Sequence, residues 1–555
     1  MGDKWEVSVN MGGISMNRRT FLKRVVSTAV FCAAGASPAQ SKNQKKSPNI
    51  IFILTDDQGW TSVSYCSDPQ KPGSRSDYIE TPRMARAARQ GMRFTSGYAP
   101  NAQCSPTRHS ILFGQNAARH IYGKDLQWTE KAPNWLTIPK VLKAANSAYR
   151  AAHFGKWHVA VTPAEAGFDF SDGPTSNYEG DTQNGKHRDT KAVARNLSRY
   201  NKDRDITPPK LNGTFSKLPV YYPDEDPKGA VSMTRRAGDF MRESLSAGKP
   251  FFAYIAHFAT HLDLVSKKET YEYFKNKKRG VKHDNPGFAA MAKDLDQAIG
   301  KTLDLVKELG IQDKTYIFIM SDNGGVQHFA QSASVDSDGE IVETHETSVT
   351  WRNLPLRHGK HEYYEGGIRV PFLVLGPDVK ANTVSRVPVT GLDLLPTFAD
   401  LAGYQGDLPE NIDGGSLVGL LRSGGVGKVR RHRDALFFHQ GAKRVPISAI
   451  RKGDYKLVKH WLAEDEKTKG PKYRGDKLIE LYDLSRDLSE SEDLSMEMPE
   501  RTRALHSELM DFLEEVGAET KYTKRWDAYN RMKKNRGLPS HGEIRLDYHS
   551  PFAGK

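Results

Sequence analysis

The sequence predicts an α/β fold: a large, mostly parallel or mixed β-sheet sandwiched by helices, plus a small C-terminal domain with an antiparallel sheet and a helix. Continuous apolar runs at 49–55 and 315–320 are bounded by turn-forming residues, which is typical of strands buried on both faces. Between about residues 48 and 422 such runs alternate with helical patterns, which indicates parallel strands with crossover helices.

Local signals place individual helices. Thr81-Pro82 is typical of a helix N-terminus, and Gly91 is expected to end that helix. Apolar residues at helical spacing predict an amphipathic helix over 288–309, with Gly310 just beyond its end.

A chain of 555 residues is longer than one hydrophobic core usually organises, so more than one domain is expected. Strand-like runs at 447–458 and 478–484, a tight-turn signal at Gly453 and a helical pattern at 499–516 predict the C-terminal part. The predicted segments are an N-terminal extension with an export signal at 1–40, the main domain at 48–422, a small α+β domain at 428–520 and a basic tail at 521–555.

The N-terminus carries a predicted export signal. Residues 17–23 read Asn-Arg-Arg-Thr-Phe-Leu-Lys, a twin-arginine signature. A weakly apolar stretch at 25–36 and small residues at 37–39 complete a signal peptide with a candidate cleavage site. That stretch is too short to span a bilayer, and no run of about 18 apolar residues occurs. We therefore expect an exported protein, periplasmic or extracellular, with no membrane span.

The formal net charge is +14, from 81 Lys and Arg against 67 Asp and Glu. A basic balance suits nucleic acid, an anionic membrane surface or a polyanionic substrate. The sequence shows no zinc-finger spacing, RNA-binding signature or long basic helix, so no nucleic-acid partner is expected.

Two acidic pairs follow the apolar strands. Asp56-Asp57 comes directly after the run 49–55, and Asp322-Asn323 follows the run 315–320. A single pair of this kind usually caps a turn. Two pairs, each at the carboxyl end of a buried strand, instead predict an oxygen-ligated divalent cation, Ca²⁺ or Mg²⁺ rather than Zn²⁺.

Cys104-Ser-Pro-Thr-Arg108 stands just before a predicted helix that begins near His109. A helix N-terminus favours negative charge, and Arg108 can bring a planar fork of donors to the same anion. The alternative is a buried cysteine beside a turn. Cys104 is the candidate nucleophile.

Four further basic residues are candidates. In Gly155-Lys156-Trp157-His158, an extended backbone would place Lys156 and His158 on the same face. His261 follows an apolar strand, and Lys360 precedes a Glu-Gly-Gly segment. Taken singly, each has a plainer explanation: a solvated lysine, or a histidine bonded to a backbone carbonyl. Together they can hold an anion and move protons.

The order of these motifs resembles the type I, formylglycine-dependent sulfatases of the alkaline-phosphatase-like superfamily. The sequence has an Asp-Asp at a strand end, Cys-x-Pro-x-Arg, Gly-Lys-Trp-His, a His after a strand, Ser-Asp-Asn-Gly, and a Lys before Glu-Gly-Gly-Ile-Arg-Val-Pro. The resemblance runs from about residue 48 to residue 484.

The resemblance implies a role for each candidate. Cys104 would be oxidised by a maturation enzyme to formylglycine, whose hydrate is the nucleophile. The implied roles are Ca²⁺ binding by Asp56, Asp57, Asp322 and Asn323, stabilisation of the sulfate oxygens by Arg108, Lys156 and Lys360, protonation of the leaving alcohol by His261, and proton removal from the hydrate by His158.

Two departures from the family pattern are visible. After Cys104 the family usually reads Leu-Thr-Gly-Arg, whereas residues 112–115 read Leu-Phe-Gly-Gln. The strand-end histidine usually lies in Pro-His-x-Pro, and here both prolines are missing around His261. His257 is therefore a competitor for the role of the acid.

We expect the substrate to be a sulfated polysaccharide or oligosaccharide. An exported enzyme encounters polymers that are too large to enter the cell, and a basic chain attracts polyanions. Polar segments at 173–205 and 332–350 are expected to line the edge of the active-site cleft. The alternatives are an arylsulfatase with small substrates, a phosphodiester or phosphonate hydrolase on the same scaffold, and a non-catalytic glycan-binding protein.

Overall fold

The computed structural model describes residues 47–119, 135–176, 220–262, 264–327, 331–335, 341–346, 353–441, 447–461 and 479–520. The predicted export signal and the basic tail lie outside these residues, as does most of the polar segment 173–205. No helix of the described part is both long and apolar enough to cross a bilayer.

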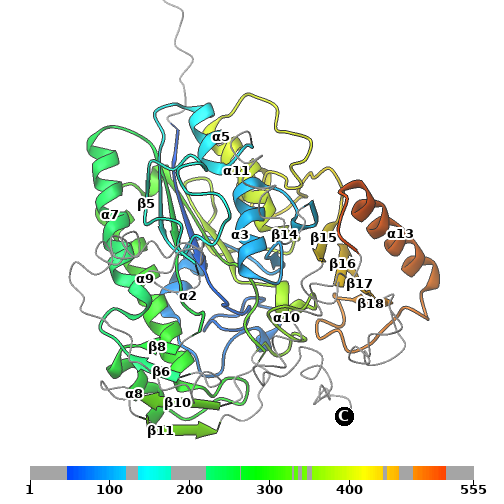
Figure 1. Ribbon diagram of the computed structural model, residues 1–555, viewed down its shortest axis with the longest axis horizontal. Coiled ribbons are helices and arrows are strands. Elements are labelled where there is room, and N and C mark those ends of the chain that lie inside the picture. Colours follow the sequence, from blue (N-terminus) through cyan, green and yellow to red (C-terminus); the bar gives the residue numbers. More distant parts are fainter. Residues whose placement is uncertain are drawn as a thin grey trace, which may run out of the picture. The chain divides into compact units, whose positions relative to one another are not determined.

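The main sheet is mixed, as predicted (Figure 1), and it has eight strands. Its centre is parallel, because β1 pairs in parallel with both β7 and β9, and β7 with β4. β12 runs antiparallel to both of its neighbours. In spatial order the strands are β13 (Thr383–Ser385), β2 (Met92–Phe94), β12 (Phe372–Leu375), β9 (Thr315–Ser321), β1 (Asn49–Thr55), β7 (Phe251–Ala256), β4 (Arg150–Gly155) and β5 (Phe170–Ser171).

Helices cover both faces of this sheet (Figure 1). Side chains of β1 alternate between two hydrophobic clusters, with Ile50, Phe52 and Leu54 in one and Ile51 and Ile53 in the other. The first cluster includes side chains of α3 (Cys104–Phe113), α5 (Ile138–Ala145) and α11 (Leu394–Ala402). The second includes side chains of α2 (Pro82–Gln90), α7 (Ala230–Ser246), α8 (Lys268–Asn276) and α9 (Pro286–Glu308).

The predicted helix ends are close to those observed. α2 begins at Pro82 and has Gly91 as its C-cap residue, as expected. α9 begins two residues before the predicted start, because the Asn285 side chain accepts a hydrogen bond from the Phe288 amide at 2.9 Å and so caps the helix. Gly310 follows its end with a φ of 62°.

The C-terminal part contains an antiparallel four-stranded sheet and one long helix, as predicted. Phe437 stacks on Phe512 of the helix with ring centroids 4.1 Å apart, and Leu457 and Leu509 belong to the same core. Gly453 occupies the turn between the second and third strands with a φ of 58°. The elements are β15 (Leu436–Gln440), β16 (Ile447–Lys452), β17 (Tyr455–His460), β18 (Ile479–Asp483) and α13 (Pro499–Glu515). The division into domains at 422 and 428 stays a prediction.

The polar segment 332–350, expected as a surface insertion, contributes strands β10 and β11 to a second four-stranded sheet. The strands of this sheet are β11 (Ile341–Glu346), β10 (Gln331–Val335), β6 (Val220–Pro223) and β8 (Leu264–Ser266). The remaining regular elements are β3 (Gly97–Tyr98), β14 (Val389–Thr390), α10 (Glu365–Ile368) and α12 (Val418–Arg422), with short 3₁₀ turns at Pro72–Ser74, Ala117–Arg119, Pro227–Gly229, Gln312–Lys314 and Gly391–Asp393.

β4 ends at a position that requires glycine. Gly155 has a φ of 93°, and a Cβ atom there would lie 2.1 Å from the Ala256 carbonyl oxygen of β7. The Lys156 amide donates to the same carbonyl at 2.8 Å. A side chain at position 155 would therefore separate β4 from β7 and displace the segment that follows.

We expect Gly155→Ala to lower the free energy of unfolding by roughly 2–5 kcal/mol. The cost of a left-handed backbone at a non-glycine residue adds to the cost of the clash with β7. The matched control is Gly310→Ala, which has a φ of 62° but no atom within 4 Å of the added Cβ, and it should cost only about 1 kcal/mol. Urea unfolding of both variants measures the difference; equal costs would contradict the close approach at β7.

Candidate active site

The four predicted metal ligands meet at one edge of the main sheet. β1 and β9 pair with Thr55 opposite Ser321, so the residues that follow both strands lie side by side. The Asp57 amide donates to Asp322 Oδ1 at 3.2 Å, and the Asp322 amide donates to the Thr55 carbonyl at 3.0 Å. The buried side chains are those of Asp56, Asp57, Asp322 and Asn323.

This cluster fits an oxygen-ligated cation. One ligand atom from each of Asp56, Asp57, Asp322 and Cys104 lies within 4.8 Å of the others. Asn323 donates Nδ2 to Asp57 Oδ1 at 2.7 Å, whereas its buried Oδ1 has no hydrogen-bond partner within the described ranges. An orphaned buried acceptor beside three carboxylates suits a hard cation such as Ca²⁺ or Mg²⁺.

Each carboxylate of the cluster is also paired with a largely buried basic side chain from another part of the chain. These six side chains sum to zero charge, so a bound divalent cation would leave the group at +2. Such a group is complementary to an anionic ligand. The ion pairs are Lys156–Asp56 at 2.5 Å, Lys360–Asp57 at 2.7 Å and Arg108–Asp322 at 2.7 Å.

Burial and charge act differently on two of the carboxylates. Burial raises the pKa of Asp56, but the nearby Lys156 and other cations outweigh it and hold the pKa well below its usual range. Burial and the neighbouring Asp56 charge raise the pKa of Asp322 to about 6, even with Arg108 in contact. A divalent cation beside Asp322 would lower its pKa and favour the ionised form of this carboxylate.

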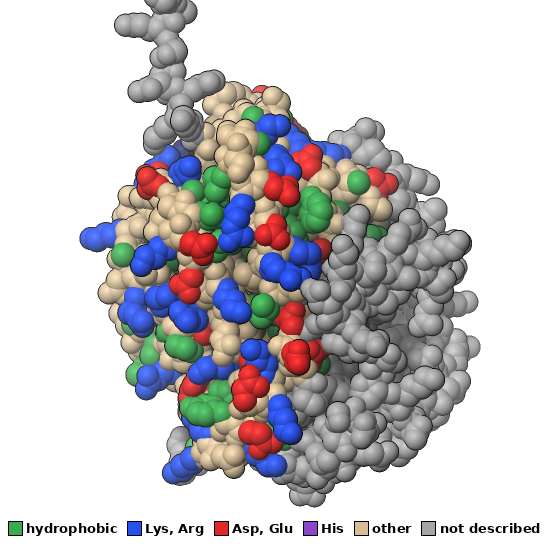
Figure 2. Space-filling model, turned by 90° about the vertical axis from the view of Figure 1, so that its left-hand side faces the viewer, with side chains coloured by type: hydrophobic (Ala, Val, Ile, Leu, Met, Phe, Trp, Pro, Cys, Tyr) green, Lys and Arg blue, Asp and Glu red, His purple; other side chains and the backbone are tan. Residues whose placement is uncertain are grey.

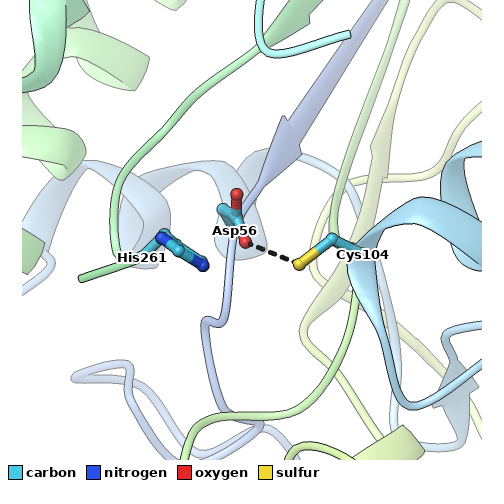
Figure 3. Close-up of side chains that lie close together, drawn as sticks. All are labelled: Asp56, Cys104 and His261. Carbon is cyan, nitrogen blue, oxygen red and sulfur yellow. Dashed lines mark hydrogen bonds between the residues drawn. The ribbon is translucent and has the colours of Figure 1, made fainter. Parts of the chain in front are cut away.

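Cys104 is the first residue of α3, and its Sγ lies 3.4 Å from Asp56 Oδ1 (Figure 3). The helix N-terminus thus faces the acidic cluster. Burial, together with the charges of Asp322 and Asp56, raises the pKa of the Cys104 thiol. Without a bound cation, an unmodified thiol here stays protonated and is a poor nucleophile, because the thiolate is the reactive form.

His109 fixes α3 against the segment after β4, a role that the sequence did not reveal. The Ala160 amide donates to His109 Nε2 at 2.9 Å. The other ring nitrogen therefore carries the proton and donates to the Ser105 carbonyl at 2.8 Å. A neutral His109 therefore connects α3, which begins at Cys104, with the segment after β4 that contains Lys156.

Lys156 and His158 do not share an extended strand, in contrast to the expected geometry. β4 ends at Gly155, and His158 has a φ of 53°. The Thr175 side chain and carbonyl accept the Trp157 and His158 amides at 2.9 and 2.8 Å, which fixes this turn. Burial, with Lys156 next, lowers the pKa of His158 well below its usual range, so the ring is neutral at pH 7.

Of the two competing histidines, His261 lies in the cluster. A ring nitrogen of His261 lies within 4.8 Å of ligand atoms of Asp56 and Cys104, and Asp56 stands between the two (Figure 3). Its Nδ1 lies 2.7 Å from the Leu262 carbonyl. Burial, and then Lys360, lowers the pKa of His261 to about 4. His257 is fully buried and belongs to neither group of potential ligands in the described part of the chain.

Backbone contacts between glycines dock the segment of Lys360 onto β9. The Gly324 amide donates to the Gly367 carbonyl at 2.9 Å, and the Lys360 amide donates to the Gly325 carbonyl at 2.9 Å. A Cβ atom at Gly324 would lie 1.9 Å from the Gly366 carbonyl oxygen. The glycines after Asn323 and Glu365 thus let two backbones touch, which brings Lys360 to Asp57.

Comparison with known proteins agrees with this geometry. Residues 48–404 match the family model Sulfatase, and residues 358–518 match the model N-sulphoglucosamine sulphohydrolase, C-terminal. A protein named Sulfatase from Formosa agariphila is 28% identical, and the similarity covers 87% of this chain and 90% of that protein.

Two further proteins are similar over most of their length. N-acetylgalactosamine-6-sulfatase of Rattus norvegicus is 28% identical, covering 80% of this chain and 75% of that protein. The crystal structure of Ps i-CgsB in complex with k-i-k-neocarrahexaose has a TM-score of 0.62 at 24% identity, covering 90% and 100% of the two chains. Because the Sulfatase model spans well over half of the sequence, the chain belongs to the sulfatase family and is a sulfuric ester hydrolase.

Proposed function

We propose that this sulfatase removes sulfate from a sulfated polysaccharide, or from an oligosaccharide cut from one, with a formylglycine made from Cys104 and a Ca²⁺ ion. The observation that carries the proposal is the buried cluster around Cys104 Sγ, in which three carboxylates face three basic side chains. We further propose that the protein is exported through the twin-arginine signature at 17–23.

The proposed roles follow from charge and position. Ca²⁺ bound by Asp56, Asp57, Asp322 and Asn323 would polarise the sulfate, and a hydrated formylglycine at position 104 would supply the attacking hydroxyl. Arg108, Lys156 and Lys360 hold the sulfate oxygens as charge redistributes onto them. These three basic residues are already oriented by the carboxylates before a substrate binds.

Two histidines move protons in the proposal. His261 donates a proton to the oxygen of the leaving alcohol, and His158, which is neutral at pH 7, accepts the proton of the hydroxyl at position 104. The low pKa of His261 results from burial and Lys360. A bound sulfate ester adds a negative charge nearby, which favours the protonated form that an acid requires.

The preference for a glycan has three supports. The names of the C-terminal family model and of the rat relative both refer to amino sugars, N-sulphoglucosamine and N-acetylgalactosamine. The net charge of +14 favours a polyanion. On the face shown in Figure 2, Lys and Arg side chains are interspersed with Asp and Glu, so the +2 charge that the cluster would have with a bound divalent cation is the more specific attraction for a sulfate group.

We expect peptide mass spectrometry of active protein to show formylglycine at position 104 when the chain is produced with a maturation enzyme. Cys104→Ala should abolish turnover and keep the fold, because one small buried side chain replaces another. Cys66 provides the control: it is a free cysteine outside the cluster, and Cys66→Ala should keep full activity. Active protein carrying only unmodified Cys104 would refute the assignment.

His261→Ala should lower kcat/KM on a sugar sulfate by about 10²- to 10⁴-fold, the usual contribution of a general acid. On an aryl sulfate with an acidic leaving phenol the loss should be much smaller, because such a leaving group needs no proton. The control is His257→Ala, with kcat/KM calculated for the folded fraction of the protein. This variant should show no such dependence on the leaving group. If His257→Ala shows the dependence and His261→Ala does not, the assignment is reversed.

The substrate class is tested by kcat/KM on sulfated oligosaccharides, on a simple aryl sulfate and on a phosphodiester. We expect the highest value on the oligosaccharides, and we expect it to fall as salt screens the attraction. Equal or better efficiency on the aryl sulfate without a salt effect indicates small substrates. Faster turnover of the phosphodiester favours the phosphoesterase alternative.

A further inference from the structure

The C-terminal part holds the segment of Lys360 from both sides. We name residues 357–365 the Lys360 loop. At its start, Arg357 Nη1 donates to Tyr482 Oη of β18 at 2.8 Å and to the Glu490 carbonyl at 2.9 Å. The Arg357 guanidinium also lies 4.0 Å from the centroid of the Tyr364 ring. The start of the loop is thus attached to the segment between β18 and α13.

The end of the loop is attached to the same residue. The Glu365 amide donates to Glu490 Oε2 at 2.6 Å. Lys456 of β17 lies between the two acids, with Nζ 3.0 Å from Glu365 Oε1 and 2.8 Å from Glu490 Oε1. All three side chains are fully buried. The backbone and the carboxylate of Glu490 therefore hold opposite ends of one loop.

Glu365, the partner of Glu490, has two further polar contacts. Tyr98 Oη donates to Glu365 Oε2 at 2.7 Å, and Arg369 Nε lies 3.3 Å from the same oxygen. Glu490 has a φ of 52°, a left-handed conformation that costs a non-glycine residue about 1 kcal/mol. Such a conformation persists where surrounding contacts enforce it, and it is common at functional positions.

The Lys360 loop connects Glu490 to the catalytic cluster. The Gly366 amide donates to the Arg357 carbonyl at 2.9 Å, which closes the base of the loop. Lys360 Nζ, near its middle, lies 2.7 Å from Asp57 Oδ1. The middle of the loop is held by the Lys360 amide on the Gly325 carbonyl and by the Lys360 ammonium on Asp57, whereas its base is held at Glu490. A shift of the base after loss of the Glu490 contact would therefore displace the ammonium of Lys360 relative to Asp57.

We propose that Glu490 is a positioning residue of this sulfatase, which fixes the Lys360 loop on the C-terminal sheet and thereby places Lys360 in the catalytic cluster. The proposal rests on the proposed sulfate-binding role of Lys360. Glu490 itself does not touch the cluster, so its contribution to turnover passes through Lys360.

A double-mutant cycle tests this coupling. Glu490→Gly removes the carboxylate and retains the left-handed backbone and the carbonyl that accepts from Arg357. We expect it to lower kcat/KM roughly 10- to 100-fold, since small displacements of a positioned group are costly. In a Lys360→Ala background the same change should cost less than about 3-fold, because coupled residues are not additive.

Two further variants separate positioning from general destabilisation. Glu490→Gln keeps one oxygen that accepts from the Glu365 amide but turns its NH₂ group toward the Lys456 ammonium, so we expect it to lower kcat/KM less than Glu490→Gly does. Glu492→Gly makes a similar change at an exposed position two residues away and should have no effect. If Glu490→Gly does not fold, Arg357→Met removes the other attachment and should show the same non-additivity with Lys360→Ala.

Hydrogen exchange gives a readout that does not depend on activity. The amides of Lys360 and Gly366 should exchange faster in Glu490→Gly, whereas those of α13 should be unchanged. Equal losses of kcat/KM with and without Lys360, or unchanged exchange in the loop, would overturn the inference and leave the proposed function intact. If Lys360→Ala alone keeps the full rate, the role of Lys360 fails and the inference fails with it.

Discussion

The burial of three carboxylates in one small cluster is the constraint on which the rest of the site depends. Like charges in a dry site repel one another, so Asp56, Asp57 and Asp322 are stable together only if positive charge surrounds them. The chain supplies Arg108 from α3, Lys156 from the turn after β4 and Lys360 from its loop. Elements far apart in sequence are thus held at one edge of the sheet.

The same arrangement prepares the site for its substrate. In the absence of a ligand the basic side chains pair with carboxylates; with a divalent cation present, they have charge to offer to a sulfate ester. Because these groups are buried and already oriented, little reorganisation is needed when charge develops on the sulfate oxygens. Three residues outside the cluster fix the backbone segments that carry these groups: His109, Thr175 and Glu490.

The central strands β1 and β9, and the carboxylates that follow them, could be predicted because their signals are local. A continuous apolar run followed by Asp-Asp predicts the strand β1 and the two carboxylates at its end. The helix after Cys-x-Pro-x-Arg was predicted too, but α3 begins at Cys104, five residues before the predicted start, so the motif forms its first turn. The turn at His158 could not be predicted, since nothing local shows that β4 ends at Gly155. Glu490 was also missed: it lies in the polar run Ser-Glu-Ser-Glu at 489–492, which suggests solvent exposure, and its partner Glu365 is 125 residues away.

The central claim is that the carboxylate cluster binds one calcium ion. Elemental analysis of purified protein, compared with Asp322→Ala, tests it most directly. The account predicts about one calcium per wild-type chain, bound calcium lost in Asp322→Ala, and zinc far below stoichiometry in both. Stoichiometric zinc, or a fully active wild-type protein without any divalent metal, would contradict it.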